Sequence, residues 1–295
     1  MTRPRVNAIA AAAALLVAFA VLYRGVIVKL VSDWAHDDNY SHGFLILPIA
    51  LYFVWERRRK LLAMTPSPSA LGLLVVIGSI ATLVAGVLGA ELFLTRVSII
   101  GLIGGVVLYT LGWRHLRVLA FPIAFLILMV PLPAIVFNQI AFPLQLLASR
   151  FGESTLQAAA IPVLREGNVI YLANTTLEVA EACSGIRSLV SLLTLGIVYG
   201  YFTDGRGWMR WLIALATVPI AIVTNGMRVA GTGIAAHYYG PEAAQGFFHE
   251  FSGWLVFVAA FALLFVIVRI LLALAPDRSR TPRPPVVGVS EKVTA

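Results

Sequence analysis

Charged side chains are scarce in this chain: Asp, Glu, Lys and Arg together make up 12% of its 295 residues. A soluble domain carries about twice that fraction. The scarcity excludes an ordinary soluble domain, and the 60% share of hydrophobic residues points the same way. Because lipid offers no hydrogen-bond partners, a backbone that crosses it must close its hydrogen bonds within helices. We therefore predict an all-α integral membrane protein.

Cysteine is nearly absent as well, since Cys183 is the only one. A single cysteine excludes an intramolecular disulfide and a cysteine-rich metal site. The net charge of +8 would suit nucleic acid, but the basic residues are scattered among short loops. Membrane topology explains such scattering. We expect no nucleic-acid partner, no metal and no cofactor.

Long apolar runs recur along the chain, and runs of about 17 to 25 residues can cross a bilayer as helices. We predict about eight spans in a single membrane domain (1–276), followed by a disordered basic tail (277–295). Ala18-Phe19-Ala20 resembles a signal-peptide cleavage site, but the first run is long and lacks a polar end, which favours an uncleaved anchor. The predicted spans cover 7–23, 43–55, 70–89, 96–112, 116–137, 185–202, 210–225 and 251–274.

The basic residues orient these spans. Fourteen fall on one side, seven on the other, and Arg269 lies inside the last span. Lys and Arg accumulate in cytoplasmic loops, so the richer side is predicted to be cytoplasmic together with both termini. The richer side carries Arg3, Arg5, Arg57, Arg58, Arg59, Lys60, Arg114, Arg117, Arg206, Arg210, Arg278, Arg280, Arg283 and Lys292. The other side carries Arg24, Lys29, Arg96, Arg150, Arg165, Arg187 and Arg228.

Two segments do not fit simple spans. Residues 138–184 form the longest polar connection, and their alternation of apolar and polar residues predicts one or two short strands in an extracytoplasmic loop. Residues 225–250 hold too many glycines for a full span. For these we predict a re-entrant or interfacial helix over 228–239.

Cys183 lies in EACSGIRSL, 181–189, at the predicted outer start of the sixth span. The unpaired N–H groups of a helix start lower a thiol pKa, favour the nucleophilic thiolate and can hold an oxyanion. The alternative is a small buried hydrophobe. Arg187 follows four residues later, so we place it on the same helix face one turn deeper, where it lowers the thiol pKa or binds a substrate carboxylate.

A cysteine nucleophile needs a base. His249 lies in FFHEFSGW at the same predicted face, and the alternative for it is an interfacial histidine among aromatic rings. Arg228 could stabilise a tetrahedral intermediate or reach lipid phosphates, and Asn225 could orient it. His42 either lines the substrate cleft, serves as an alternative base, or packs at a helix start. Glu181 is a further substrate-binding candidate. Of the other histidines, His36 and His237 share the outer face and His115 does not.

Three blocks in order, EACSGIRSL (181–189), NGMRVAGTGI (225–234) and HEFSGW (249–254), together with NYSHGFLILPIALYFVWERRRK (39–60), resemble the exosortase/archaeosortase family, most closely the exosortase A type. The resemblance covers nearly all of the chain. It implies a membrane cysteine transpeptidase in which Cys183 is the nucleophile, His249 the general acid/base and Arg228 the stabiliser of the transition state.

The resemblance also implies the setting. Family substrates are exported proteins whose C-terminal signal has a Pro-Glu-Pro-type (PEP-CTERM) motif, a transmembrane helix and a basic cluster. Such systems accompany exopolysaccharide genes in Gram-negative bacteria. A bacterial inner membrane and a periplasmic active site follow, with an acceptor nucleophile left open. For the substrate glutamate we consider Arg187 or Arg165.

Two rival classes remain at this stage. A transporter or channel also uses intramembrane charge and broken helices, but the chain shows no inverted repeat and its polar residues collect at one face. A lipid or polysaccharide transferase could use Asp33, Asp37 and Asp38 to bind a metal, but a solvated acidic loop is the favoured explanation of this cluster.

Overall fold

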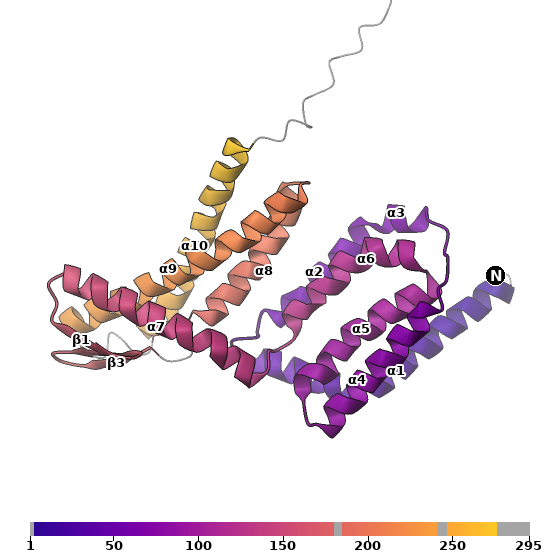
Figure 1. The fold of residues 1–295 in the computed structure, drawn as a ribbon, viewed down its shortest axis with the longest axis horizontal. Helices are drawn as coiled ribbons and strands as arrows, with labels where there is room; N and C mark the ends of the chain where they lie inside the picture. The colour runs from indigo at the N-terminus through magenta and orange to yellow at the C-terminus, as the bar shows by residue number, and fades with distance from the viewer. Residues whose placement is uncertain (1–2, 180–184, 241–246, 276–295) are drawn as a thin grey trace, which may run out of the picture.

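The computed structural model describes residues 3–179, 185–240 and 247–275, with side chains described from residue 13 and again from 253 in the last stretch. The predicted all-α membrane fold is confirmed (Figure 1). The helices are α1 (Arg3–His36), α2 (Gly43–Glu56), α3 (Arg58–Leu62), α4 (Leu71–Leu88), α5 (Leu92–Thr110), α6 (Trp113–Phe125), the 3-10 helix η1 (Leu126–Met129), α7 (Ala134–Ala158), α8 (Ile186–Thr203), α9 (Gly207–Tyr239) and α10 (Phe247–Leu274). The strands are β1 (Val163–Glu166), β2 (Val169–Leu172) and β3 (Thr176–Glu178).

The number of spans is lower than the predicted eight. Within the described residues, six helices are long and apolar enough to cross a membrane, and α2 is an apolar helix of only 14 residues. A seventh span results if α6–η1 and α7, which meet at an angle of 78°, are taken as one broken span. The break falls where the predicted span 116–137 reaches Pro131 and Pro133. Each proline lacks an N–H and disfavours helix in the residue before it.

The predicted separate helix over 228–239 is also wrong, because these residues complete the 33-residue helix α9. The helix continues through its glycines. These glycines allow α7 to pack closely against α9, and this packing supports the helix. A Cβ at Gly226 would meet the ring of Phe151, and one at Gly233 would meet Leu156. Small residues at such crossings let helix backbones approach, as is common in membranes.

The long connection 138–184 contains more structure than predicted. Its first half belongs to α7, and its second half forms an antiparallel sheet of three strands in the order β1-β2-β3. The turn between β1 and β2 uses Gly167 at a φ of +62°, a conformation that glycine adopts without strain. Ile170 of β2 is fully buried against a cluster that includes Leu156 of α7 and Val229 of α9.

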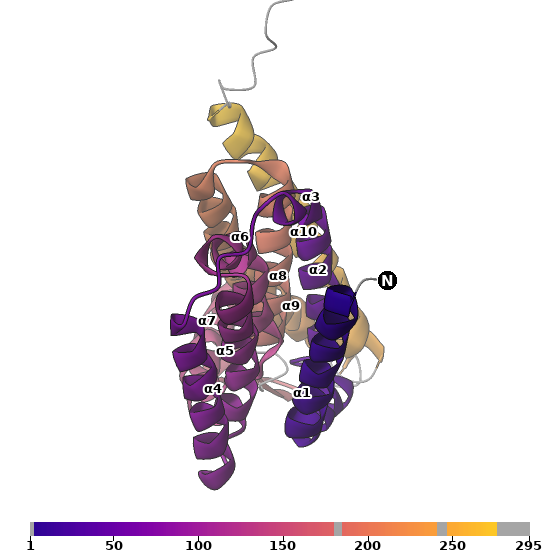
Figure 2. The same cartoon turned by 90° about the vertical axis from the view of Figure 1, so that its right-hand side faces the viewer.

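Aromatic packing joins the first six helices to α8. Phe53 of α2 is fully buried and contacts Phe125 of α6 and Tyr201 of α8, with ring centroids 5.4 and 4.6 Å apart. The Tyr201 hydroxyl donates a hydrogen bond to Glu56 at 2.5 Å. This contact lies toward the end of the molecule where α3, the α8–α9 connection and the last turn of α10 gather (Figures 1 and 2).

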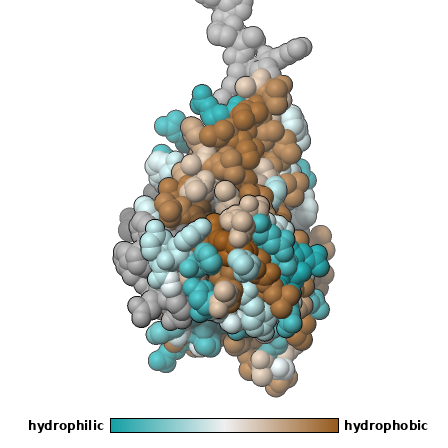
Figure 3. Space-filling view, turned by 90° about the vertical axis from the view of Figure 1, so that its left-hand side faces the viewer, coloured by the Kyte–Doolittle hydropathy of each residue, from teal (hydrophilic) through white to brown (hydrophobic). Residues whose placement is uncertain are grey.

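We call the opposite end the sheet end. There the strands meet the last turn of α9, since Asn174 Nδ2 donates to the carbonyl of Ala236 at 3.0 Å. Figure 3 shows hydrophilic residues over the lower part of this side and a hydrophobic band above them. Exposed side chains of α10 such as Leu255, Val258 and Phe261 are suited to contact lipid.

Candidate active site

The structure describes some of the predicted site residues. For the others it describes only residues that precede or follow them in the chain. Cys183 and Glu181 lie outside the described residues. Position 249 lies in the first turn of α10, but its side chain is likewise outside the described part. Asn225, Arg228, Arg187 and His42 are described, and they lie on three different elements near the sheet end.

Both described flanks of the Cys183 segment lie beside a side-chain amide. On one flank, the N–H of Val179 donates to the carbonyl of Asn168 at 2.9 Å, and Asn168 Nδ2 donates to the carbonyl of Val179 at 3.2 Å. On the other flank, Gly185 is the N-cap of α8 and has a φ of +80°. A Cβ at Gly185 would lie 2.7 Å from Cγ of Asn225 in α9. The segment that carries the only cysteine therefore reaches α8 directly beside Asn225.

The helix start corrects one expectation. We placed Cys183 and Arg187 on one helix face because they are four residues apart, yet α8 begins at Ile186. The left-handed conformation of Gly185 ends the helical periodicity, which requires a negative φ at each position. The four-residue spacing therefore does not indicate that Cys183 and Arg187 share a helix face.

One turn of α9 links this segment to α10. Arg228 follows Asn225 by three residues, so the two positions lie on neighbouring faces of the same turn. A Cβ at Gly253 of α10 would lie 3.3 Å from Nη2 of Arg228. Gly253 is four residues, or one turn, after position 249. The turn of α9 that carries Asn225 and Arg228 therefore contacts Gly185, two residues after Cys183, and Gly253, four residues after His249.

Arg187 faces the turn between α1 and α2. Its Nη2 lies 2.7 Å from a carboxylate oxygen of Asp38, which is 79% exposed. Its Nε is buried and has no hydrogen-bond partner within the described part of the chain. The alternative carboxylate binder, Arg165, already pairs with Glu153 at 2.7 Å and donates to the carbonyl of Gly167. Arg187 is therefore the better placed of the two to receive a ligand.

His42 closes the same turn and supports η1. His42 Nε2 lies 3.1 Å from the carbonyl oxygen of Leu128, and Trp34 Nε1 donates to the carbonyl of Met129 at 2.9 Å. Since a carbonyl only accepts, this contact is a hydrogen bond in the tautomer that carries the proton on Nε2. His42 makes no side-chain cap at α2. Burial lowers the pKa of His42 below its ordinary 6.5, which favours the neutral ring.

A cavity of about 300 Å³ separates the turn and η1 from α7 and α8. Three of its lining residues each have a buried side-chain atom that lacks a hydrogen-bond partner among the described residues: Asn39 Oδ1, His42 Nδ1 and Arg187 Nε. Its other walls are formed by Tyr40, Ile127, Leu128, Val130, Leu132, Phe137, Ile140, Ile186, Leu189, Val190 and Leu193. The sequence prediction missed Asn39, although it stands beside His42 in the block that carries the resemblance, NYSHGFLILP.

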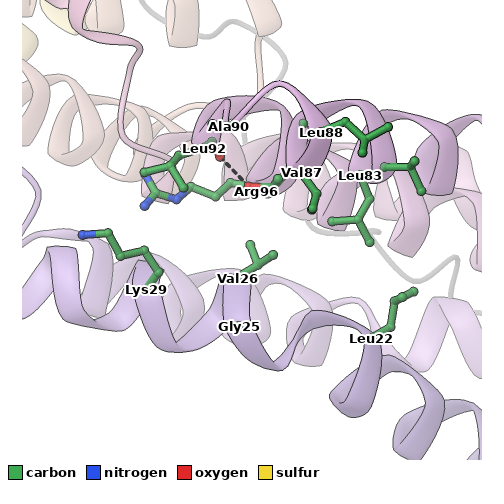
Figure 4. A pocket seen from close by; sticks show the side chains of 13 residues that line it. Leu22, Gly25, Val26, Lys29, Leu83, Val87, Leu88, Ala90, Leu92 and Arg96 are labelled. Carbon is green, nitrogen blue, oxygen red and sulfur yellow. Dashed lines mark hydrogen bonds between the residues drawn. The ribbon is translucent and has the colours of Figure 1, made fainter.

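The acidic cluster does not form a metal site in the described residues, where no group of three suitable ligands occurs. Asp33 pairs with Arg96 and Lys29, Asp37 accepts from the N–H of Asn39, and Asp38 pairs with Arg187. Each carboxylate thus has its own partner. Figure 4 shows Lys29 and Arg96 at one end of a groove of about 490 Å³ between α1 and α4–α5, with leucines and valines along it. None of the predicted site residues lines this groove.

The remaining histidines are dispersed. His36 is exposed at the end of α1, and His237 lies half-buried in the last turn of α9. His115 is buried at the start of α6.

The fold is that of a polytopic helical membrane protein, and the described candidate residues lie toward one end of its bundle. The family model described as Transmembrane exosortase (Exosortase_EpsH) matches residues 34–266. The chain belongs to this exosortase family. Neither the curated proteins nor the solved structures that were searched include a match.

Proposed function

We propose that this chain is a membrane cysteine transpeptidase that uses Cys183, His249 and Arg228. One observation carries the proposal: a single turn of α9 contacts both the residue two positions after Cys183 and the residue one turn after His249. Exosortase family membership supports the same assignment, because these residues stand in the blocks through which the sequence resembles that family.

In the proposed reaction, the Cys183 thiolate attacks a peptide carbonyl and forms a tetrahedral intermediate. The Arg228 guanidinium stabilises the negative oxygen. His249 protonates the leaving amine, the C–N bond breaks, and a thioester remains. An amine acceptor then displaces the thiol to give transfer, while water gives hydrolysis. In either case His249 takes the proton from the incoming nucleophile and Cys183 is regenerated.

The proposed substrate is an exported protein with a C-terminal Pro-Glu-Pro-type motif, a transmembrane helix and a basic cluster. Such a substrate is already anchored by its helix, so the enzyme meets it within the bilayer. Anchoring both partners in one plane replaces an encounter in bulk with a positioned one. We place the chain in the bacterial inner membrane, with both termini in the cytoplasm and the sheet end facing the periplasm. The excess of basic residues at the other end supports this orientation.

The test is a processing assay in membranes. A tagged substrate carrying the sorting signal is co-expressed with each enzyme variant at matched levels, and its size is followed by blot. We expect Cys183→Ala to abolish cleavage, His249→Ala to slow it by about 10²–10⁴-fold, and Arg228→Ala by about 10²–10³-fold.

Matched controls come from the same end of the molecule. Arg150→Ala removes an exposed arginine of α7, and His237→Ala removes a histidine of α9. Both should process the substrate as the wild type does. Cleavage by Cys183→Ala would place the nucleophile elsewhere and sink the proposal. Equal losses in the control variants would show that any change at this end impairs folding.

A further inference from the structure

The small sheet leaves one of its edges open. Within the described residues, β3 is the last strand in the order β1-β2-β3, so it has a strand partner on one side only. Two of its three residues, Thr176 and Glu178, are exposed. The other edge strand, β1, is tied to α7 through the ion pair of Arg165 with Glu153. The edge of β3 is therefore the place where this sheet has room for a further strand.

The hydrogen-bond register between β2 and β3 shows which backbone groups face that edge. In an antiparallel pair, alternate residues direct both N–H and C=O toward the partner strand, and the residues between them direct both away from it. The N–H of Leu172 donates to the carbonyl of Thr175 at 2.8 Å. At the other end of β3, the N–H of Val179 donates to the carbonyl of Asn168 at 2.9 Å. Both bonds fit one alternation, in which positions 175, 177 and 179 face β2.

Thr176 and Glu178 therefore direct their backbone groups to the open edge. Each presents one N–H and one C=O, and within the described part of the chain no backbone hydrogen bond to these groups is found outside the sheet. The two residues are spaced by about 6.6 Å along the strand. A second extended backbone carries N–H and C=O groups in the same alternation and spacing, and edge strands bind peptides in this way.

We infer that the open edge of β3 binds the motif segment of the substrate as a fourth strand of the sheet. The backbone groups of Thr176 and Glu178 pair with those of the substrate. This inference rests on the proposed function for the identity of the substrate. It adds where the motif binds and which groups recognise it.

A Pro-Glu-Pro-type motif suits an added edge strand. Its two prolines are separated by one residue, so they occupy alternate positions of an extended chain. Proline has no N–H and is tolerated in a strand where the N–H would point away from the ladder. With both prolines in such positions, the residue between them directs its N–H and C=O to β3. Proline also keeps the residue before it extended, which lowers the entropy cost of ordering the peptide.

The strand leads directly to the segment that contains Cys183. Val179 follows β3 and stands four residues before Cys183, so the two positions are at most about 14 Å apart. On the other side, Gly185 follows Cys183 by two residues and is held beside Asn225. A motif that pairs with β3 is therefore brought within reach of the proposed nucleophile. The strand positions the substrate, and the chemistry takes place beside it.

Cysteine cross-linking tests the pairing without requiring catalysis. Cys183→Ala removes the only cysteine, and Thr176→Cys or Glu178→Cys is then added. The matched control is Tyr171→Cys, because Tyr171 is 39% exposed and lies opposite Thr176 on β2, one strand further from the edge. The probe is a precursor that carries one cysteine, moved residue by residue through the motif and its flanks, and treated with a mild oxidant.

Strand pairing predicts a register in the cross-links. The substrate position that reacts best with Thr176→Cys and the position that reacts best with Glu178→Cys should be two residues apart. Each should exceed its neighbours about tenfold, since directly opposite residues lie within disulfide range. Tyr171→Cys should give about tenfold less product, because an added strand lies two strand spacings, or about 9.6 Å, from β2.

Two outcomes would overturn the inference. Equal yields from Tyr171→Cys, or best positions without the two-residue offset, would show that the substrate does not pair with the edge. Disulfides between two enzyme molecules that form in preference to those with the precursor would show that the edge pairs copies of this chain.

A proline substitution tests the edge in the processing assay. Thr176→Pro removes an N–H that faces the open edge and keeps the bonds to β2, so processing should fall about three- to tenfold. Val163→Pro is the matched control: Val163 is opposite Leu172, which bonds to β3, so the backbone of Val163 faces away from β2 at the other edge. This variant should process the substrate as the wild type does at matched protein levels. Equal losses in the two variants would count against the edge of β3.

The two proposals fail separately. If the wild type leaves the precursor uncleaved but the two-residue offset appears, the transpeptidase proposal is wrong and the binding edge stands. If the wild type cleaves the precursor but the offset is absent, the function stands and the inference about β3 is wrong.

Discussion

At the scale of single residues, His42 shows how a tertiary contact sets the chemistry of a side chain. His42 Nε2 lies 3.1 Å from the carbonyl oxygen of Leu128, and the residue lines the cavity between η1 and α8. Burial favours the neutral ring by lowering the pKa below 6.5. Asp37 and Asp38 precede His42 in the same turn, and Arg187 of α8 lines the same cavity.

His42 makes the stability of the protein sensitive to acid. Because its pKa is lowered in the folded protein, the unfolded chain binds more protons at this position when the pH falls below 6.5. The stabilising contribution of the neutral ring is complete above pH 6.5 and is lost as the pH falls through the lowered pKa. We expect the half-life of the wild type at a fixed temperature to shorten between pH 7 and pH 5.

His42→Gln supplies the comparison, since its side-chain N–H can donate to Leu128 and it does not titrate in this range. The acid-dependent part of the inactivation should be smaller in this variant. Parallel curves for the two proteins would show that His42 is not held neutral. Measurements on purified protein in detergent or nanodiscs suffice, and no substrate is required.

At the scale of elements, the start of α8 depends on a glycine for two independent reasons. Gly185 has a positive φ, and its Cα lies against Asn225. A side chain at this position meets a backbone penalty of roughly 1–2 kcal/mol and a clash with a buried amide. The approach of α8 to α9 beside Cys183 therefore requires glycine.

We expect Gly185→Ala to lower the unfolding free energy by roughly 2 kcal/mol or more and to reduce processing beyond what the loss of folded protein explains. Gly167→Ala measures the backbone penalty alone, since Gly167 has a φ of +62° and a Cβ there would meet nothing within 4 Å. Gly205→Ala has neither feature and should behave as wild type. Thermal unfolding and the processing assay together measure both effects. If Gly185→Ala matches Gly167→Ala in both, contact with Asn225 has no role.

At the scale of the whole molecule, the two ends of the bundle differ in composition and structure. One end carries the strands, the start of α8 and the end of α9, while the other carries α3 and the α8–α9 connection (Figures 1 and 2). Our proposed function requires the sheet end to face the periplasm, where exported substrates arrive.

Cysteine labelling tests that orientation. In the Cys183→Ala background, Ala173→Cys places an exposed thiol at the sheet end and Gly205→Cys places one at the opposite end. A membrane-impermeant maleimide added to cells with a permeable outer membrane should modify Ala173→Cys at least tenfold faster than Gly205→Cys. After the inner membrane is opened, the two should react at similar rates. The opposite order in intact cells would invert the proposed topology.

The sequence by itself determined the class of the protein and most of its apolar helices. Low charge, long apolar runs and the strand pattern near 163–178 are local properties, and local properties decide which segments enter lipid and which become strands. The blocks around Cys183, Arg228 and His249 also identified the family that the comparison then confirmed.

Only the tertiary structure decided where helices end and what meets at the site. Residues 228–239 are too polar and glycine-rich to be expected as part of a long helix, yet they continue α9 because α7 covers their small residues. Asn39, His42 and Arg187 line one cavity although nearly 150 positions separate the turn from α8. Hydropathy indicates how favourably a single segment enters lipid. Burial by another helix and contacts between distant segments depend instead on how the whole chain packs.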